Sequence, residues 1–159
     1  TLASFLRSWS GPVDTKKIMS RLKQVAEELG LPLGERRKTY NSRLAQELAK
    51  WAESKGKGDP FHESVFRAYF VDGKNIGKVD ELVALVKSIG LPEKEARSAL
   101  ESRAFKEAVD ADWSRSRTLG ITGVPTFLVD HRATVGFQPY ETLEKFLKTC
   151  GVKQRKNPD

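Results

Sequence analysis

The sequence of 159 residues has little cysteine and little histidine: one cysteine, Cys150, and two histidines, His62 and His131. A single cysteine excludes an internal disulfide framework and any zinc site built from several cysteines, in agreement with a reducing compartment. Neither histidine has further ligands around it at metal-site spacing, so we expect no metal site. The chain also lacks an apolar run long enough to span a membrane and an N-terminal signal segment. We therefore expect a cytoplasmic protein that makes no membrane contact.

Positive charge is abundant but dispersed. The chain has 28 Lys and Arg against 21 Asp and Glu, a net charge of +7, and 38% hydrophobic residues, enough for one domain with a core. Only two basic clusters stand out, Arg36-Arg37-Lys38 in a loop and Lys153-Gln154-Arg155-Lys156 in a polar tail. No aromatic residues are interleaved with either cluster, so we expect no nucleic-acid partner.

Apolar residues recur at helical spacing through most of the chain, between caps and glycine or proline breaks. The pattern predicts eight helices, which run from Leu2 to Trp9, from the cap Asp14 to Leu29, from the cap Asn41 to Gly56, from the cap Asp59 to Phe70, from Val79 to Ile89, from Pro92 to Leu100, from the cap Ser102 to Leu119 and from Pro139 to Cys150.

Several apolar positions on these helices are expected to be buried. The stripe from Ile18 to Leu29 should face a core, and Phe66 and Phe70 should widen the apolar face of their helix so that it is covered on more than one side. Trp113 is expected in a core between flanking acidic residues. Cys150 falls on the inward face of the last helix and is expected to be a small buried residue rather than a reactive thiol.

Strands are expected only in the last third, at Thr126–Val129 and Ala133–Gly136, joined by a turn through Asp130-His131-Arg132. This arrangement predicts an α+β fold that is mostly helical. A lone two-stranded hairpin is marginal and leaves unpaired backbone groups along its edge. We therefore expect a homodimer or an exchange of elements between copies that covers the edge of Thr126–Val129.

The segment Gly120–Val129 places a Val124-Pro125 bond where a glycine-punctuated loop enters the first strand. An X-Pro bond adopts the cis form at modest cost, and proline has no N–H to pair within a sheet. A cis bond would turn the backbone of Val124 outward to pair with an extended peptide or with glutathione. A purely structural turn is the alternative that the residues leave open.

This segment resembles the cis-proline loop of thioredoxin-like proteins. Together with Phe66-Arg67-Ala68-Tyr69-Phe70 and Gly136-Phe137-Gln138-Pro139 it resembles the DsbA family, in particular its FrnE-like branch, from about Val13 to Thr149. The resemblance implies a helical insertion domain at 13–119, a C-terminal thioredoxin-like β-β-α half at 120–151 and a polar tail at 152–159. In that family a Cys-x-x-Cys follows an N-terminal strand. The strand that matches Thr126–Val129 pairs with this N-terminal strand. These 159 residues hold no such motif, and their start at Thr1 rather than Met favours a trimmed chain.

The resemblance implies a thiol-disulfide oxidoreductase-like protein that holds a thiol or disulfide substrate, protein or glutathione, at the cis-proline loop. The substrate-binding residues would be Gly123, Val124, Pro125, Thr126 and Asn41. Without the Cys-x-x-Cys, the chain has no catalytic residue to name and is expected to be inactive; no cofactor is expected unless it is glutathione.

Asn41 carries a second resemblance, because Asn41-Ser42 is similar to an Asn-Thr pair of FrnE-like proteins, chromene-carboxylate isomerases and kappa-class glutathione transferases. As plain chemistry, Asn41 is a helix N-cap. Two further functions stay open: a relative of glutathione-dependent isomerases or transferases, and a non-catalytic binding or dimerisation module.

Overall fold

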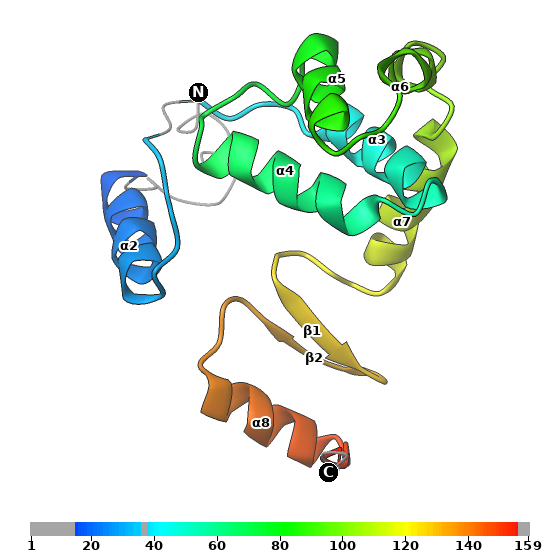
Figure 1. Ribbon diagram of the computed structural model, residues 1–159. Coiled ribbons are helices and arrows are strands. Elements are labelled where there is room, and N and C mark those ends of the chain that lie inside the picture. The colour runs from blue at the N-terminus through cyan, green and yellow to red at the C-terminus, as the bar shows by residue number, and fades with distance from the viewer. Residues whose placement is uncertain (1–14, 36–37, 156–159) are drawn as a thin grey trace. The chain divides into compact units, whose positions relative to one another are not determined.

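The computed structural model describes residues 15–35 and 38–155 (Figure 1). The predicted helix Leu2–Trp9 and the predicted cap Asp14 lie outside these residues. Within them the fold is mostly helical with a small antiparallel sheet, which confirms the predicted fold class. The elements are α2 (Thr15–Glu28), α3 (Arg43–Ser54), α4 (Gly58–Phe70), α5 (Val79–Ser88), α6 (Glu93–Glu101), α7 (Lys106–Thr118), β1 (Thr126–Val129), β2 (Arg132–Val135) and α8 (Tyr140–Thr149).

The chain divides into two compact units, residues 1–110 and 111–159. The predicted boundary after residue 119 between a helical domain and a β-β-α half stays a prediction. Among the described residues, no helix combines the length and apolar character that a membrane span needs. In the same part of the chain, no three His, Cys, Asp or Glu residues gather into a group that could hold a metal ion.

The core of the first unit lies between α3, α4, α5 and α6. Helix α3 packs against the other three, α5 packs against α4 and α6, and apolar side chains from each meet between them. Burial of these side chains supplies the main favourable free energy of folding. The most deeply buried are Leu48, Ala52, Phe61, Ala68, Leu82, Val86, Ala96 and Leu100.

Two expectations about burial in this unit are wrong. Within the described part of the chain, the stripe from Ile18 to Leu29 does not face a core, because Ile18, Leu22 and Leu29 are 38%, 48% and 54% exposed. Phe66 and Phe70 are likewise exposed, at 57% and 37%, so α4 is covered on one side only. Helical periodicity identifies an apolar face, but what covers that face depends on elements far away in the sequence.

Three predicted helix caps lie within the described residues, Asn41, Asp59 and Ser102, and none of them occupies an observed N-cap position. Ser42, not Asn41, occupies the cap position of α3. Helix α4 begins at Gly58, so Pro60 lies third in the helix, where its missing N–H is still harmless. Ser102 ends α6 instead of starting α7, and Arg103 follows in a left-handed conformation with φ 54°.

The second unit contains the predicted hairpin. β1 pairs with β2 in antiparallel register, Thr126 opposite Val135 and Val129 opposite Arg132, around a two-residue turn whose Asp130 has φ 52°. The second strand therefore begins one residue earlier than predicted. No described residue of 111–159 is fully buried, and the expectation of a core Trp113 is wrong, because this side chain is 46% exposed.

Candidate functional site

The loop that carries four of the five predicted site residues links α7 to β1. Gly120 has φ 68°, a left-handed conformation that favours glycine. This residue ends the helical conformation that follows α7, and the chain then continues toward β1. The Val124–Pro125 peptide bond is cis. The Thr126 hydroxyl donates a 2.6 Å hydrogen bond to the Gly123 carbonyl, which closes the loop on itself. Val124 is left at its tip, 89% exposed.

The loop is also tied to the end of the second strand. The Gly136 N–H donates a 2.7 Å hydrogen bond to the Pro125 carbonyl. A Cβ atom at Gly123 would lie 3.3 Å from Val135 Cγ1, so glycine permits this close approach. Within the described ranges, β2 is the one strand that pairs with β1. The other edge of β1 and the exposed tip are the type of surface to which an extended peptide adds by backbone hydrogen bonds.

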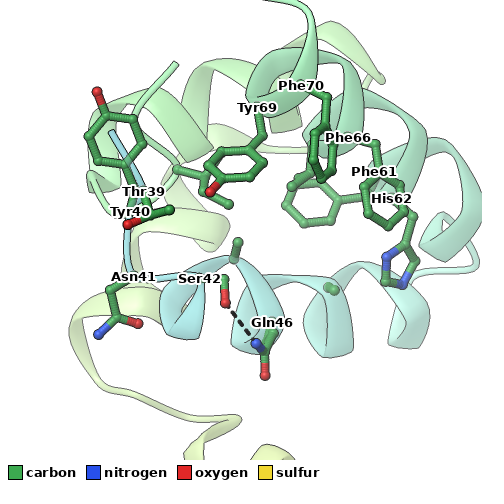
Figure 2. Close-up of a pocket in the computed structure, with 14 residues that line it drawn as sticks. Thr39, Tyr40, Asn41, Ser42, Gln46, Phe61, His62, Phe66, Tyr69 and Phe70 are labelled. Atoms are coloured by element: carbon green, nitrogen blue, oxygen red, sulfur yellow. Dashed lines mark hydrogen bonds between the residues drawn. The ribbon is translucent and has the colours of Figure 1, made fainter. Parts of the chain in front are cut away.

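The fifth predicted residue, Asn41, belongs to the first unit, where it lines a pocket of about 760 Å³ between the start of α3 and one face of α4 (Figure 2). This volume falls in the range of small-molecule sites. The pocket is lined by Thr39, Tyr40, Asn41, Ser42, Ala45, Gln46, Ala49, Phe61, His62, Val65, Phe66, Tyr69, Phe70 and Ile76.

One wall of the pocket is aromatic. His62, Phe66 and Phe70 are four residues apart on α4, so their rings lie on one helix face. The ring centroids of His62 and Phe66 are 6.4 Å apart and those of Phe66 and Phe70 are 6.1 Å apart, each pair inclined by 28°. The ring of Tyr69 meets Phe70 edge-on at 4.9 Å. Figure 2 shows these rings opposite α3, across the pocket.

The polar groups of the pocket gather at the start of α3. The Asn41 side-chain oxygen accepts a 2.8 Å hydrogen bond from the Arg43 N–H, so Asn41 does hold the first turn, one position before the cap residue. The Gln46 amide donates to the Ser42 hydroxyl oxygen at 2.9 Å. Ser42 makes no side-chain cap bond to the helix backbone. Its hydroxyl is therefore fixed by a side chain rather than by the helix end.

Glu47 on α3 is the centre of a buried ion network in the first unit. Glu47 is 2% exposed, and its carboxylate accepts hydrogen bonds from Arg103 Nε and Nη2 at 2.7 and 2.6 Å and from Arg43 Nε at 2.7 Å. Arg43 also contacts the Lys106 carbonyl and the Asp110 carboxylate, both at 2.7 Å. The network therefore links α3 to the connection between α6 and α7.

The electrostatics of the network follow from these contacts. The hydrogen bonds from Arg103 and then Arg43 hold the pKa of Glu47 below its ordinary value, against the opposing effect of burial. The hydrogen bond to Glu47 raises the pKa of Arg43 and of Arg103. Lys106 and then Arg43 lower the pKa of Asp110. The charges are thus mutually compensated, which identifies a structural cluster rather than an acid–base pair.

Cys150 and His131 belong neither to the loop Gly123–Thr126 nor to the lining of the pocket. Cys150 follows the last residue of α8 and is half-buried, so the expectation of a fully buried residue is wrong. His62 and His131 are both exposed, and His62 also forms part of the pocket wall. Neither this pocket nor the Glu47 network was predicted from the sequence. The spacing of four residues between His62, Phe66 and Phe70, and between Arg43 and Glu47, was the available signal.

Comparison with known proteins gives one family. The family model described as the DSBA-like thioredoxin domain matches residues 6–148. The uncharacterized protein YwbO of Bacillus subtilis strain 168 is 31% identical over 103 residues, a match that covers 64% of this chain and 52% of YwbO. The chain thus spans about half the length of the curated relative that it matches.

Solved structures share the fold. A probable DsbA oxidoreductase from Streptomyces coelicolor superposes with a TM-score of 0.81 at 23% identity, over 99% of this chain and 70% of that one. A 2-hydroxychromene-2-carboxylate isomerase gives a TM-score of 0.69 at 21% identity, over 92% and 73%. The cytosolic disulfide reductase DsbM from Pseudomonas aeruginosa gives 0.60 at 23% identity, over 84% and 75%, and its structure with GSH is also similar.

Proposed function

Because the chain belongs to the DSBA-like thioredoxin domain family, we propose that it takes part in thiol-disulfide chemistry and holds a thiol or disulfide substrate at the loop Gly123–Thr126. The observation that carries the proposal is the exposed tip of this loop, where Val124 is 89% exposed beside the edge of β1 with which no other strand of the described residues pairs. A backbone in this position can pair with the extended main chain of a peptide or of glutathione. The known structure of a similar reductase with GSH supports glutathione as the first ligand to test.

The same proposal assigns binding, and not exchange, to these 159 residues. Disulfide exchange needs a thiolate that attacks a sulfur, and such thiolates are favoured at helix N-termini and in Cys-x-x-Cys motifs. Cys150 instead follows the C-terminal end of α8 and is the one cysteine of the sequence. We therefore expect insulin reduction by this chain to stay at the uncatalysed rate, and the Cys150→Ser variant to behave identically. Turnover at the level of an intact thioredoxin-like enzyme, lost in Cys150→Ser, would refute this part.

Glutathione binding tests the loop directly. In calorimetric titrations with reduced and with oxidised glutathione, we expect binding that Val124→Pro abolishes, because this substitution removes the N–H at the loop tip. Val124→Ala keeps the N–H and is the matched control, with affinity unchanged. Circular dichroism verifies that both variants fold. Absence of binding by the wild-type chain, or equal binding by the two variants, would contradict the assignment of the loop.

The proposal includes a homodimer or a swapped assembly that covers the edge of β1. It rests on the pairing of β1 with β2 alone among the strands of residues 15–35 and 38–155, and on the exposure of apolar side chains around β1, such as Phe127, Leu128 and Val135. Light scattering of the purified chain is expected to give twice the monomer mass. A monodisperse monomer at high concentration would remove the assembly from the proposal without affecting glutathione binding.

A relative of the glutathione-dependent isomerases is a second candidate. The position of Asn41-Ser42 at the polar end of a pocket of about 760 Å³, and the similarity of the fold to an isomerase structure, favour it. Here the thiol of glutathione would supply the nucleophile. This candidate predicts that glutathione binding weakens in Asn41→Ala. If peptides or glutathione bind at the loop alone, Asn41→Ala should leave glutathione binding unchanged.

A further inference from the structure

Helix α2 carries a narrow apolar stripe with the spacing of a coiled-coil seam. Ile18, Leu22, Val25 and Leu29 follow one another at intervals of four, three and four residues. Leu29 comes directly after the helix, and its N–H still donates to the Val25 carbonyl. Val25 is half-buried and the other three are 38–54% exposed. Among the described residues, no α2 side chain belongs to the core of the first unit, so the stripe can receive a helix from another molecule.

One flank of the stripe carries charges of opposite sign at its two ends. Arg21 directly precedes Leu22 and Glu28 directly precedes Leu29, so both charged residues lie beside the seam on the same side, two turns apart. A chain of hydrogen bonds marks this flank. The Arg21 guanidinium donates to the Gln24 side-chain oxygen at 3.1 Å, and the Gln24 amide donates to the Glu28 carboxylate at 2.8 Å. Charged residues beside a seam select the partner helix and its direction.

The charges of α2 also oppose the dipole of the helix. Lys16 and Lys17 lie in the first turn, Glu27 and Glu28 lie in the last, and α2 has neither an acidic first turn nor a basic last turn. Anions are favoured at a helix N-terminus and cations at a C-terminus, so this distribution destabilises α2 on its own. A second α2 in the antiparallel direction would place its acidic end beside the basic end of the first. A parallel copy would place like charges side by side.

We propose that α2 binds a second copy of this chain, with the two α2 helices antiparallel across a two-fold axis. Leu22 of each copy packs against the partner's Val25, and Arg21 pairs with the partner's Glu28, so symmetry gives two ion pairs. The seam spans fewer than two heptads, so the dimer is weak, with a dissociation constant of roughly 10 µM to 1 mM.

This surface is separate from the site of the proposed function. Every residue that carries the inference lies on or directly after α2, and none belongs to the loop Gly123–Thr126 or to β1. If the chain also assembles through β1, the α2 contact joins those assemblies, and variants of α2 should remove only that joining step.

Charge reversal tests the pairing, with the dissociation constant measured by sedimentation equilibrium of the 159-residue chain at low salt. Arg21→Glu would set two carboxylates against each other in each pair, and Glu28→Arg two guanidinium groups. Each variant alone is expected to associate about ten- to thirtyfold more weakly than the wild type. The double variant Arg21→Glu/Glu28→Arg restores opposite charges and should associate as the wild type does.

A mixture of the two single variants provides a test that changes within one chain cannot imitate. In an antiparallel pair of Arg21→Glu with Glu28→Arg, both ion pairs join opposite charges. The equimolar mixture is therefore expected to associate at least as tightly as the wild type, although neither component does so alone. A mixture that associates no more tightly than its components would overturn the proposal.

Lys23→Glu is the matched control. It makes the same change in net charge on the same helix, but Lys23 lies away from the flank of Arg21, 4.0 Å from Glu27 of its own helix. It should leave the dissociation constant almost unchanged. Leu22→Ala shortens an exposed side chain of the seam and should weaken the dimer about tenfold or more, while circular dichroism shows an unchanged fold.

Three results would contradict the inference. A wild-type chain that shows no self-association up to about 1 mM would exclude the dimer. Equal association of the wild type, Arg21→Glu and Leu22→Ala would place any assembly on another surface, such as the edge of β1. A double variant as weak as the two single variants would exclude the antiparallel direction.

Discussion

The substitution Glu47→Gln tests whether the buried ion network of α3 stabilises the first unit. It keeps the shape of the side chain and replaces one carboxylate oxygen by an NH₂ group. Both oxygens of Glu47 accept hydrogen bonds, three in all at 2.6 to 2.7 Å, and every donor is a guanidinium nitrogen. The new NH₂ group would therefore face another donor, and the charges of Arg43 and Arg103 would lose their buried counter-charge.

The expected loss follows from the burial of Glu47. Breaking a buried pair by removing one partner costs about 3–5 kcal/mol, and the lower end applies here because glutamine keeps one acceptor. For a chain of this length, a loss of about 3 kcal/mol lowers the melting temperature by roughly 6–12 °C. Urea unfolding followed by circular dichroism and by the fluorescence of Trp51, which is buried on the same helix, measures it.

Glu53→Gln is the matched control. The same substitution on the same helix removes an exposed carboxylate that lies 3.5 Å from Lys50 Nζ and is 45% exposed. Exposed ion pairs contribute about 0–1 kcal/mol, so this variant should unfold almost as the wild type does. If Glu47→Gln lost less than about 1 kcal/mol, or no more than the control, the network would not be the stabilising element inferred here.

The pH dependence of the unfolding free energy also tests the stabilisation by Glu47. The pKa of Glu47 is lowered in the folded chain, so the unfolded chain takes up the proton first as the pH falls. The stabilisation by Glu47 is thus present above the ordinary glutamate pKa of about 4.3 and is lost as the pH falls toward the folded value. The difference in unfolding free energy between wild type and Glu47→Gln should be constant near neutral pH and shrink in acid. A difference that grew in acid would contradict the assignment.

Two further predictions concern packing in the first unit. Phe61→Ala should cost about 3–5 kcal/mol in urea unfolding, because Phe61 is fully buried at the centre of the core and its removal leaves a cavity; a loss below about 1 kcal/mol would mean that the core collapses around it. Gly34→Ala should destabilise the chain by more than Gly58→Ala. A Cβ at Gly34 would lie 2.0 Å from the backbone carbonyl oxygen of Val71, whereas the atom nearest to a Cβ at Gly58, at 2.8 Å, belongs to the side chain of Glu53. Equal melting temperatures for the two variants would be evidence against the contact between Gly34 and Val71.

The helices were largely predictable from the sequence because their signals are local. Apolar spacing and glycine breaks placed α5 within one residue of its observed end at Ser88. The start of α7 could not be predicted in this way. Ser102 has the chemistry of a cap, but Arg103 adopts φ 54° beside it and binds Glu47, which lies 56 residues earlier. A contact of that sequence separation leaves no mark on the local pattern.

The two candidate sites differ in the same way, because local sequence specifies the loop and tertiary packing forms the pocket. The loop Gly120–Thr126 was predictable because glycine, proline and β-branched residues specify a turn and a strand within ten positions. The pocket was not, because Ser42 and Phe66 come from different helices and meet only through the packing of α3 on α4. Helical periodicity places Phe66 on the apolar face of α4, but it does not show that the tertiary packing leaves the ring of Phe66 exposed.

The second unit shows what a covering partner would have to supply. Consecutive residues of a strand point to opposite faces of a sheet, so a hairpin covered on one face buries every second side chain. Phe127 and Leu128 are neighbours on β1 and are 38% and 36% exposed, so neither face of the hairpin is closed. Addition of a strand at the edge of β1 would satisfy backbone groups but would not cover the exposed third of either side chain. The proposed assembly must therefore cover at least one face as well as the edge, which favours an exchange of whole elements over the addition of a single strand.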